Sequence, residues 1–597
     1  MSFRPAMKMI EAHANSSNNR IAMRQKRYGI WQEYNWSDVY EISKNIGAAL
    51  IGIGVKRHTK IGILSENRRE WVLAQFGIQA AGSTVVGMYA TSPAAEIEHY
   101  VNAADCEILF IEDQEQFDKI SELKGKIPKL RKLIIFEPKG IGSETHLDLQ
   151  SFSEFVASGA AAPCESELRL RIDETRSDDT ALMVFTSGST GLPKAAEITH
   201  GNYFAASRLV NWLFENISSD ANVLSYLPLN HIAEQEMTVI NALASGRTMN
   251  FGESLRTIIP DLRDVAPEIF FGVPRIWEKM RAGVEVQTKT AGFVRRWLIE
   301  RALISAERRN RVPLNHWKVN ELVSHYFWDL LVYRHIRSYL GLGRCRIALS
   351  AAAPISVELL QFFRGIGVNI REVWGMSETT GAVTAQPDWG DCIGRVGQFP
   401  DQIEWRIADD GELLIKGDIV FKGYYGNPTA TADTIVKGWL HTGDIAEAAS
   451  DGSISIIDRK KDIIITAAGK NLAPTHIENT MKASRFIKEC IVIGDRRPYV
   501  VALIQIDFET VRVWAEANRV IYTTFRSLAE SEAVINLINE EVERQNSVLA
   551  PVEQIKCFSL LIKELDHDDG EVTATMKVRR AAISKIYASE IESLYLR

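Results

Sequence analysis

Helical and extended periodicities alternate along the first part of the chain. Apolar residues recur at helical spacing over residues 36–53, and this predicted helix ends near Gly52 and Gly54. Compact apolar runs predict buried strands at residues 61–64, 84–89 and 108–111. Further helices are predicted between them, over residues 70–81 and 94–103. Because strands that alternate with helices usually pair in parallel, this pattern predicts an α/β fold with a largely parallel, helix-covered sheet.

The later segments lose this regular alternation. Residues 158–163 are small and end in a proline, which predicts a connector. Residues 279–346 are helical, basic and aromatic, whereas strands dominate from residue 411 onwards. Strands in the last part are predicted at residues 490–493 and 500–506. At 597 residues the chain exceeds one comfortable hydrophobic core, so two or more domains are expected.

The composition argues against several classes of function. The net charge of −7 gives no basic footprint of the kind that nucleic-acid-binding proteins carry. The six cysteines lie far apart without a Cys-x-x-Cys pair, which argues against a disulfide framework or a zinc site and for a reducing cytoplasm. We expect no signal peptide and no membrane-spanning segment, so any membrane contact would be peripheral.

One loop concentrates residue types that bind polyphosphates. Residues 186–194 follow a predicted buried strand at 181–185 and combine hydroxyls, glycines and a lysine in one turn. Glycines let backbone N–H groups approach an anion, hydroxyls add donors, and Lys194 supplies a positive charge. The pattern is not a Walker A loop, because no Lys-Ser or Lys-Thr pair follows the last glycine. A flexible surface loop of serine and glycine is the alternative.

Two further motifs suit a nucleotide. In residues 373–381, Trp374 can stack on a purine and Glu378 can hold a hard divalent cation beside phosphates. Later in the chain, Asp444 offers two acceptor oxygens, which suit the two hydroxyls of a ribose. Taken in isolation, each motif could equally be a surface turn with an incidental carboxylate.

Together these motifs resemble the adenylate-forming superfamily of acyl-CoA synthetases, peptide-synthetase adenylation domains and luciferases. The resemblance runs from residue 34 to about residue 587, with the motifs in the family's order. It implies a ligase that uses ATP, Mg²⁺ and a thiol such as coenzyme A. It also implies a large N-terminal domain of helix-covered β-sheets with a β-rich subdomain, followed by a smaller, mobile α+β domain.

The resemblance implies roles for individual residues. Lys577 would bridge the acyl carboxylate and the α-phosphate, and Glu378 would bind Mg²⁺ with help from Thr186. His231 would border the carboxylate, although a lone histidine is more often structural. Contacts with phosphate or nucleotide are implied for Ser187, Gly188, Ser189, Thr190, Gly191, Lys194, Ala352, Ala353, Pro354, Trp374, Gly375, Met376, Ser377, Asp444 and Arg459. The family more often has tyrosine where this chain has Trp374.

The charged run at residues 458–462 resembles the hinge between the two domains of the superfamily. It implies an N-terminal domain of residues 1–458 and a C-terminal domain of residues 459–597, with Lys461 at the position of rotation. A charged run of this kind is usually a solvated turn. Gly469 and Lys470 resemble the loop that lines the pantetheine path, although one glycine stands where the family has two.

Two strings narrow the resemblance to fatty substrates. Residues 270–279 resemble a stretch typical of long-chain acyl-CoA synthetases, and residues 571–580 resemble long-chain and bubblegum-type enzymes. The implied reaction converts a long-chain fatty acid to acyl-adenylate and transfers the acyl group to coenzyme A. A fatty acyl-AMP ligase that loads a carrier protein is one alternative. A fatty-acyl or nucleotide binding module without catalysis is the other.

The segment at residues 279–346 is open to two interpretations. Its arginines and aromatic residues could form an amphipathic surface that contacts membranes near the opening for an insoluble fatty acid. A solvated charged face backed by ordinary helix packing is the alternative, and the sequence favours it because no periodic lipid-facing stripe is evident. We therefore expect a cytoplasmic enzyme whose partners are a fatty acid and coenzyme A.

Overall fold

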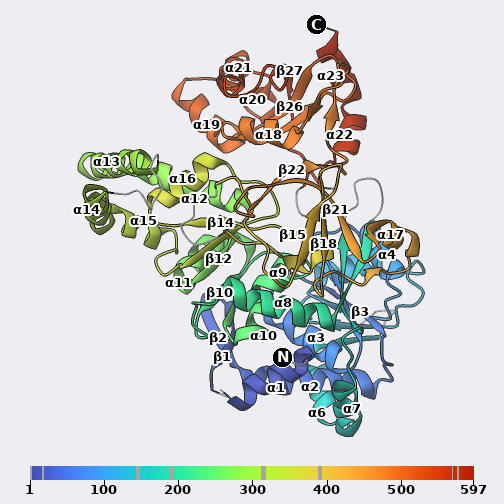
Figure 1. Cartoon of the computed structure of the whole chain (residues 1–597). Helices are drawn as coiled ribbons and strands as arrows, with labels where there is room; N and C mark the ends of the chain where they lie inside the picture. Colours follow the sequence, from blue (N-terminus) through green and yellow to red (C-terminus); the bar gives the residue numbers. More distant parts are fainter. Residues whose placement is uncertain are drawn as a thin grey trace.

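The chain forms a large N-terminal domain and a smaller C-terminal domain, which lies above it in Figure 1. The computed structural model describes residues 3–16, 19–142, 148–186, 193–310, 318–386, 393–567, 569–573 and 577–596. Separate groups of buried apolar side chains support the two domains, since some lie wholly within residues 6–454 and the others within residues 464–591. The predicted architecture, α/β with a second, smaller domain, is confirmed.

The parallel sheet predicted from residues 36–111 is present. Its strand order is β19-β9-β8-β4-β3-β5-β6-β7, and all neighbours from β8 to β7 pair in parallel. Its strands are β3 (Lys60–Leu64), β4 (Thr84–Met88), β5 (Ile108–Ile111), β6 (Lys132–Ile135), β7 (Asp148–Ser151), β8 (Thr180–Thr186), β9 (Lys194–Thr199) and β19 (Gly423–Tyr424). Its helices include α2 (Trp36–Gly52), α3 (Arg69–Ala80), α4 (Ala94–Ala103), α5 (Gln114–Ser121) and α7 (Glu165–Asp173). For the elements predicted in this sheet and its helices, the ends differ from the prediction by no more than one residue.

A second sheet forms the other half of the N-terminal domain. Its order is β14-β13-β12-β10-β11-β1-β2, and only the β1–β2 hairpin is antiparallel. Its strands are β1 (Ile21–Arg27), β2 (Ile30–Asn35), β10 (Asn222–Ser225), β11 (Thr248–Phe251), β12 (Ile269–Phe271), β13 (Ile347–Ser350) and β14 (Ile370–Glu372). Helices nearby in the chain are α1 (Ala6–Ser16), α8 (His200–Leu213), α10 (Asn241–Ser245), α11 (Ile258–Val265) and α16 (Val357–Gly365). Because parallel strands end at one edge, the loops after β13 and β14 emerge side by side.

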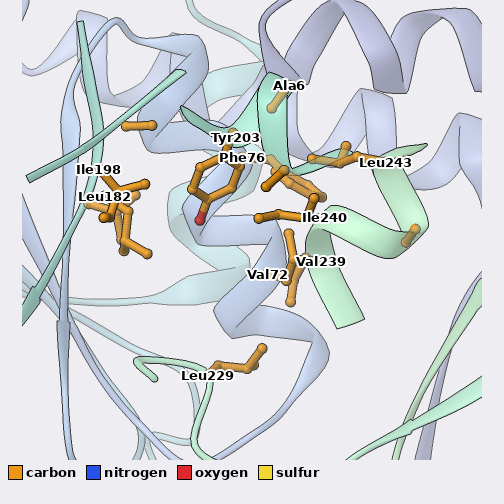
Figure 2. Packing of buried hydrophobic residues seen from close by; sticks show 14 of the residues in the cluster. Ala6, Val72, Phe76, Leu182, Ile198, Tyr203, Leu229, Val239, Ile240 and Leu243 are labelled. Carbon is orange, nitrogen blue, oxygen red and sulfur yellow. The ribbon is translucent and has the colours of Figure 1, made fainter. Parts of the chain in front are cut away.

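The core of the N-terminal domain contains a buried polar network. Figure 2 shows Phe76 and Tyr203 within the apolar cluster. The Tyr203 hydroxyl donates to Oε1 of Gln235 at 2.7 Å, and Nε2 of Gln235 donates to the carbonyl oxygen of Leu229 at 2.6 Å. Because such buried bonds have no water to replace them, they fix the turn that leads to His231.

The basic and aromatic segment is helical, as predicted. It comprises α12 (Pro274–Thr290), α13 (Phe293–Asn310), α14 (Val319–Trp328), a π-helix η4 (Asp329–Tyr333) and α15 (Arg334–Tyr339). Figure 1 shows α13 and α14 at the outer margin of the molecule. Tyr333 is fully buried, and its hydroxyl donates to the carbonyl oxygen of Ala302 at 2.7 Å. Among the helices described, none is long and apolar enough to cross a bilayer.

The prediction of a connector at residues 158–163 is wrong for residues 158–160. Helix α6 (Phe152–Ala160) continues to residue 160, and Ser151 and Glu154 form a capping box at its start. A Cβ atom added at Gly159 would lie only 1.7 Å from the carbonyl oxygen of Asn45 in α2. The small residues therefore allow close contact between two helices and do not mark a linker.

The β-rich subdomain and the C-terminal domain complete the chain. The subdomain contains β17 (Glu404–Ile407), β18 (Glu412–Lys416), β20 (Ile435–Val436), β21 (Trp439–Ala448) and β22 (Ile454–Arg459). The C-terminal domain has a sheet of β25 (Ile487–Ile493), β26 (Val500–Ile506) and β27 (Ile555–Leu560), with helices α18 (Pro474–Lys482), α19 (Phe508–Ala517), α20 (Phe525–Ala529), α21 (Glu532–Asn546), α22 (Arg580–Ile586) and α23 (Ala588–Tyr595). Both strands predicted in this domain are present.

Replacing Gly159 tests the close packing of α6 on α2. We expect Gly159→Ala to lower the free energy of unfolding of the N-terminal domain by about 1–3 kcal/mol, because the added methyl group must push two backbones apart. Gly283→Ala is the matched control, since Gly283 is also helical but has no atom within 4 Å of an added Cβ. The control should be neutral or stabilising by up to about 1 kcal/mol in urea unfolding. Equal stability of the two variants would contradict this packing.

Candidate active site

Two of the motifs leave neighbouring strands at the same edge of the second sheet. Ser350 of β13 pairs with Glu372 of β14, and the N–H of Val373 donates to the carbonyl oxygen of Ser350 at 3.0 Å. The loop after β13 carries the exposed residues Ala352, Ala353 and Pro354. The loop after β14 carries Trp374, Gly375, Met376 and Ser377. The structure thus brings the two predicted nucleotide motifs together.

Gly375 occupies a position where no side chain fits. It begins β15 (Gly375–Met376), which pairs with β16 (Gly381–Ala382) around the short 3₁₀-helix η5 (Ser377–Thr379). A Cβ atom at Gly375 would lie 1.9 Å from the carbonyl oxygen of Gly381. This tight hairpin holds Glu378 at its turn.

Asp444 is clamped between an indole and a guanidinium. Its Oδ2 accepts a hydrogen bond of 2.9 Å from Nε1 of Trp374, and its Oδ1 lies 2.8 Å from Nε of Arg459. Burial raises the pKa of the Asp444 carboxyl, while Arg459 and the Trp374 hydrogen bond act against this shift. Each oxygen keeps a second lone pair. The carboxylate can therefore accept two further hydroxyl donors without losing its partners.

Glu378 is joined to the strand that follows the predicted phosphate loop. Its Oε1 accepts a hydrogen bond of 2.6 Å from the hydroxyl of Tyr424, and the ring of Tyr424 lies 5.2 Å from Nζ of Lys194. Lys194 in turn pairs with Thr186 across the β8–β9 ladder. Thr186, Lys194, Glu378 and Tyr424 thus form one connected group.

Tyr424 is a member of this group that the sequence analysis did not assign to the site. It reaches Glu378 because β19 adds to the edge of β9, with Tyr424 opposite Ala196. Burial raises the pKa of its phenol, and the neighbouring Glu378 carboxylate raises it further, so the hydroxyl remains a donor. The Gly-Tyr-Tyr string marks the residue in the sequence, but no local pattern places it beside a carboxylate.

The oxygen atoms of Glu378 and Thr186 are of the kind that binds a magnesium ion. Glu378 is buried, and its Oε2 makes no hydrogen bond among the described residues, whereas Oε1 is held by Tyr424. Thr186 adds a hydroxyl oxygen at the end of β8. Within the described ranges no three His, Cys, Asp or Glu side chains cluster as a metal site. Such a sparse set of oxygen donors suits Mg²⁺, which takes few protein ligands and completes its shell with water and phosphates.

Part of the predicted phosphate loop lies outside the described residues, namely Ser187, Gly188, Ser189, Thr190 and Gly191. The ends of the loop are described. Thr186 closes β8, and Lys194 begins β9 with an exposed side chain. Just before Lys194, the carbonyl oxygen of Pro193 lies 2.8 Å from Nε2 of His99 on α4.

Lys577 sits on a β-hairpin of the C-terminal domain. Val572 and Val578 form a bridge, and the N–H of Thr573 donates to the carbonyl oxygen of Lys577 at 2.8 Å. The base of the hairpin is fixed by Glu571, which is fully buried. The Glu571 carboxylate accepts hydrogen bonds of 2.8 Å from Lys563 and 2.7 Å from Tyr587. These contacts orient the hairpin within its own domain.

The hairpin places the Lys577 ammonium within electrostatic range of Arg459, Asp444 and Glu378, although the residue as a whole is exposed. Desolvation lowers the pKa of the Lys577 ammonium, and the nearby Arg459 lowers it further, whereas Asp444 and Glu378 act in the opposite direction. Desolvation also lowers the pKa of His231 to about 4, with a further contribution from Lys577, so this imidazole is neutral at physiological pH. His231 caps the short helix α9 (Ile232–Glu234), where Nδ1 accepts from the N–H of Ala233 at 3.2 Å.

Three predicted residues are not brought to this group. Lys461 is exposed just beyond β22. Gly469 and Lys470 form the exposed turn between β23 (Ile464–Ile465) and β24 (Asn471–Leu472). In the part of the chain described, no hydrogen bond or ion pair joins this turn to Asp444, Glu378 or Lys577.

Comparison with known proteins identifies relatives along the whole chain. Residues 10–425 match the family described as AMP-binding enzyme, and residues 461–597 match the AMP-binding enzyme C-terminal domain. The chain is 31% identical over 589 residues to the long-chain-fatty-acid–CoA ligase FadD15 of Mycobacterium tuberculosis, covering 98% of this chain and 96% of that protein. It is 30% identical to human long-chain-fatty-acid–CoA ligase 1, covering 94% and 83%. It is 28% identical to the ligase ACSBG2 of Xenopus laevis, covering 98% and 83%.

Solved structures resemble this fold. The anthranilate CoA ligase AuaEII in complex with anthranoyl-AMP aligns with a TM-score of 0.73 at 18% identity, covering 99% of this chain and 98% of that one. The adenylation domain of a carboxylate reductase from Mycobacterium chelonae aligns with a TM-score of 0.75 at 18% identity, covering 99% and 91%. At this identity the likeness supports the two-domain fold alone.

The lowered pKa of Lys577 leads to a pH-dependence prediction. If Lys577 must be protonated for adenylation, kcat/KM for ATP should fall as the pH rises. Because the pKa of Lys577 is lowered, this alkaline fall should begin at a pH below the free-lysine pKa of 10.5. In Lys577→Arg this alkaline fall should disappear up to about pH 11, because a guanidinium keeps its proton above about pH 12. The measurement is pyrophosphate release against pH.

Lys422→Arg is the matched control for this prediction. Lys422 is an exposed lysine that donates to the carbonyl oxygen of Asp178. Its substitution should leave the pH profile unchanged. An alkaline fall at the same pH in Lys577→Arg and in the wild type would assign the titration to another group.

Proposed function

Because this chain belongs to the AMP-binding enzyme family, we propose that it activates a long-chain fatty acid with ATP and transfers the acyl group to coenzyme A. The products are acyl-CoA, AMP and pyrophosphate. The proposal is supported by the electrostatic proximity of Lys577 to Arg459, Asp444 and Glu378, in a chain similar over its whole length to long-chain-fatty-acid–CoA ligases. The enzyme uses ATP, Mg²⁺ and coenzyme A.

The first step forms a mixed anhydride. A carboxylate oxygen of the fatty acid attacks the α-phosphorus of ATP, and the bond to the pyrophosphate oxygen breaks. The charge that develops on the phosphate oxygens requires nearby cations, and Lys577 and Lys194 supply them. Mg²⁺ held by Glu378 and Thr186 would neutralise phosphate charge when bound. His231 borders the acyl carboxylate as a neutral imidazole. With a pKa of about 4 it takes up no proton at physiological pH, so it adds no charge beside the carboxylate.

The nucleotide is held by residues of two loops and two strands. Asp444 accepts the ribose hydroxyls, and Arg459 both orients Asp444 and reaches the ribose. Trp374 packs against the adenine side. The small residues Ala352, Ala353 and Pro354 and the turn Gly375, Met376 and Ser377 let the flat base approach the backbone. The resemblance assigns phosphate binding to Ser187, Gly188, Ser189, Thr190, Gly191 and Lys194.

The second step requires a different orientation of the C-terminal domain. The thiol sulfur of coenzyme A attacks the acyl carbonyl carbon, the bond to AMP breaks, and the thiol loses its proton. We place the boundary between residues 458 and 459, because Arg459 ends β22 and the next buried apolar group begins at Ile464. Rotation about Lys461 would withdraw Lys577 and present Gly469 and Lys470 to the pantetheine path.

The proposal of a fatty substrate rests on the relatives and on the sequence of residues 270–279. Residues 270–279 form the end of β12 and the start of α12, where Trp277 is fully buried and its Nε1 donates to the carbonyl oxygen of Gly272 at 2.8 Å. The string therefore belongs to a strand of the second sheet and to the helix that follows this strand. A carrier-protein acceptor and a binding module without catalysis are the competing functions, and neither gains support from the relatives named above.

Pyrophosphate release tests the proposed function. With Mg²⁺-ATP and a ladder of free fatty acids, we expect sustained turnover that requires coenzyme A and is greatest for long chains. A single burst of pyrophosphate that is indifferent to coenzyme A would favour a carrier-protein acceptor. Lys577→Ala should reduce acyl-adenylate formation by about 100-fold or more, while transfer from supplied acyl-adenylate to coenzyme A changes little. Undiminished adenylation in this variant would contradict the role of Lys577.

We also propose that this enzyme is cytoplasmic and contacts membranes peripherally through α13, α14 and η4. The sequence favoured a solvated charged face here, yet large apolar side chains lie at the surface. They are Phe293, Val294, Trp297 and Ile304 of α13, Val319, Leu322, Val323, Tyr326 and Phe327 of α14, and Leu330 and Leu331 of η4. Phe293 is 85% exposed and Tyr326 is 71% exposed.

The charges of this surface favour a bilayer with anionic lipids. Arg295, Arg296, Arg301 and Arg308 of α13 are all exposed. Aromatic residues partition into the interface of a bilayer, and arginines pair with anionic headgroups. The combination fits a lipid surface better than water, since apolar side chains of this size rarely gather on a free surface.

Vesicle binding tests the membrane contact. The double variant Phe293→Ser, Tyr326→Ser should bind vesicles of phosphatidylcholine and phosphatidylglycerol about 10-fold more weakly than the wild type. Binding should also weaken with added salt and with pure phosphatidylcholine. Ile521→Ser is the matched control, because Ile521 is 93% exposed in the C-terminal domain. Equal binding of both variants, or an effect on self-association alone in gel filtration, would refute this surface.

A further inference from the structure

A carboxylate of the N-terminal domain contacts the Lys577 hairpin directly. Oε1 of Glu96 in α4 accepts a hydrogen bond of 3.3 Å from Nη2 of Arg579, which lies two residues beyond Lys577. Oε2 of Glu96 lies 3.5 Å from Nε2 of His567, which precedes the hairpin. Glu96 therefore touches the C-terminal domain on both sides of the hairpin that carries the lysine.

Glu96 is held in place by one residue of its own helix and one residue that precedes the helix. Its Oε2 accepts hydrogen bonds of 3.0 Å from the hydroxyl of Ser92 and 3.2 Å from the hydroxyl of Tyr100. The side chain of Glu96 is only 18% exposed. Because the carboxylate is already oriented and partly desolvated, its contact with Arg579 loses less to side-chain entropy and solvent than a surface ion pair does.

A second charged contact joins the domains elsewhere. Nη2 of Arg275, at the start of α12, donates to Oδ2 of Asp507 at 2.8 Å. Asp507 caps α19 of the C-terminal domain, where Oδ1 accepts from the N–H of Thr510 at 3.1 Å. Arg275 is also paired with Glu278 at 3.0 Å, so both partners are positioned beforehand.

Two contacts at different elements constrain rotation more than one does. The domain could turn about a single contact. With two contacts, the hairpin must leave α4 and α19 must leave α12 together if the domain turns. We propose that Glu96 and Arg275 are positioning residues that hold the C-terminal domain in the orientation where Lys577 faces Asp444 and Glu378. They favour adenylation over the transfer step, and this inference rests on the two-step reaction proposed above.

The helix α4 gives this arrangement a further consequence. His99, on the same helix as Glu96, lies 2.8 Å from the carbonyl oxygen of Pro193 at the end of the phosphate loop. One rigid helix therefore contacts both the segment that follows the phosphate loop and the hairpin that brings Lys577. Lys194 and Lys577, the two cationic groups proposed to act on ATP, are therefore both positioned relative to α4.

The experiment compares the two half-reactions in separate assays. Glu96→Gln should lower the rate of acyl-adenylate formation about 5- to 10-fold, whereas transfer from supplied acyl-adenylate to coenzyme A should stay equal or become faster. Arg275→Gln should show the same split. Glu98→Gln is the matched control on α4, because the one ion pair of Glu98 within the described residues is with Lys126 of its own domain. It should leave both half-reactions unchanged.

A double variant separates the contact from general damage. Glu96→Gln combined with Arg579→Gln should be no slower in adenylation than either single variant, because both remove the same interaction. Equal slowing of both half-reactions, fully additive effects, or no effect of Glu96→Gln on either step would overturn the inference.

Hydrogen exchange provides a readout that does not depend on activity. The amides of Thr573 and Lys577 are bonded within the hairpin. In Glu96→Gln, exchange at the α4 and hairpin segments should rise, with no rise in the core strand β26. Unchanged exchange would refute the contact. If the wild type produced no acyl-adenylate from any fatty acid, the proposed function would fail, while the exchange result would still decide whether Glu96 holds the hairpin.

Discussion

The ion pair between Asp444 and Arg459 is the interaction on which the arrangement of the site depends. It spans two adjacent strands, because Asp444 of β21 pairs with Arg459 of β22 in the register of the sheet. Immediately before Arg459, the carboxylate of Asp458 accepts hydrogen bonds from the N–H and the hydroxyl of Thr475 in α18. The residues proposed to hold the nucleotide are thus adjacent in the chain to a residue that contacts the C-terminal domain.

Much of the fold could be predicted from local patterns in the sequence. Buried parallel strands are short apolar runs, and the helices between them carry apolar residues at helical spacing, so β3 to β5 and α2 to α4 appear where expected. The motifs could be placed as well, because loops that follow parallel strands must share an edge. The nucleotide motifs after β13 and β14 do so.

What the sequence did not reveal depends on pairing between distant segments. Tyr424 reaches Glu378 only because β19 joins β9, which lies more than two hundred residues earlier in the chain. The helical end of α6 looked like a linker, since small residues serve both in connectors and in close helix contacts. The exposed apolar side chains of α13 and α14 were also missed. A helix wheel shows which residues share a face, but only the neighbouring elements decide which face stays uncovered.

The order of strands in the second sheet has a consequence for synthesis on the ribosome. Strand β1 pairs in parallel with β11, and Met23 lies opposite Met249, so the partner is made more than two hundred residues after β1. At about 5–20 residues per second, the β1–β2 hairpin must wait on the order of 10–45 seconds for that partner. During this interval one edge of β1 is unpaired. The charged residues Arg24, Lys26 and Arg27 within the strand discourage association with other nascent chains until β11 arrives.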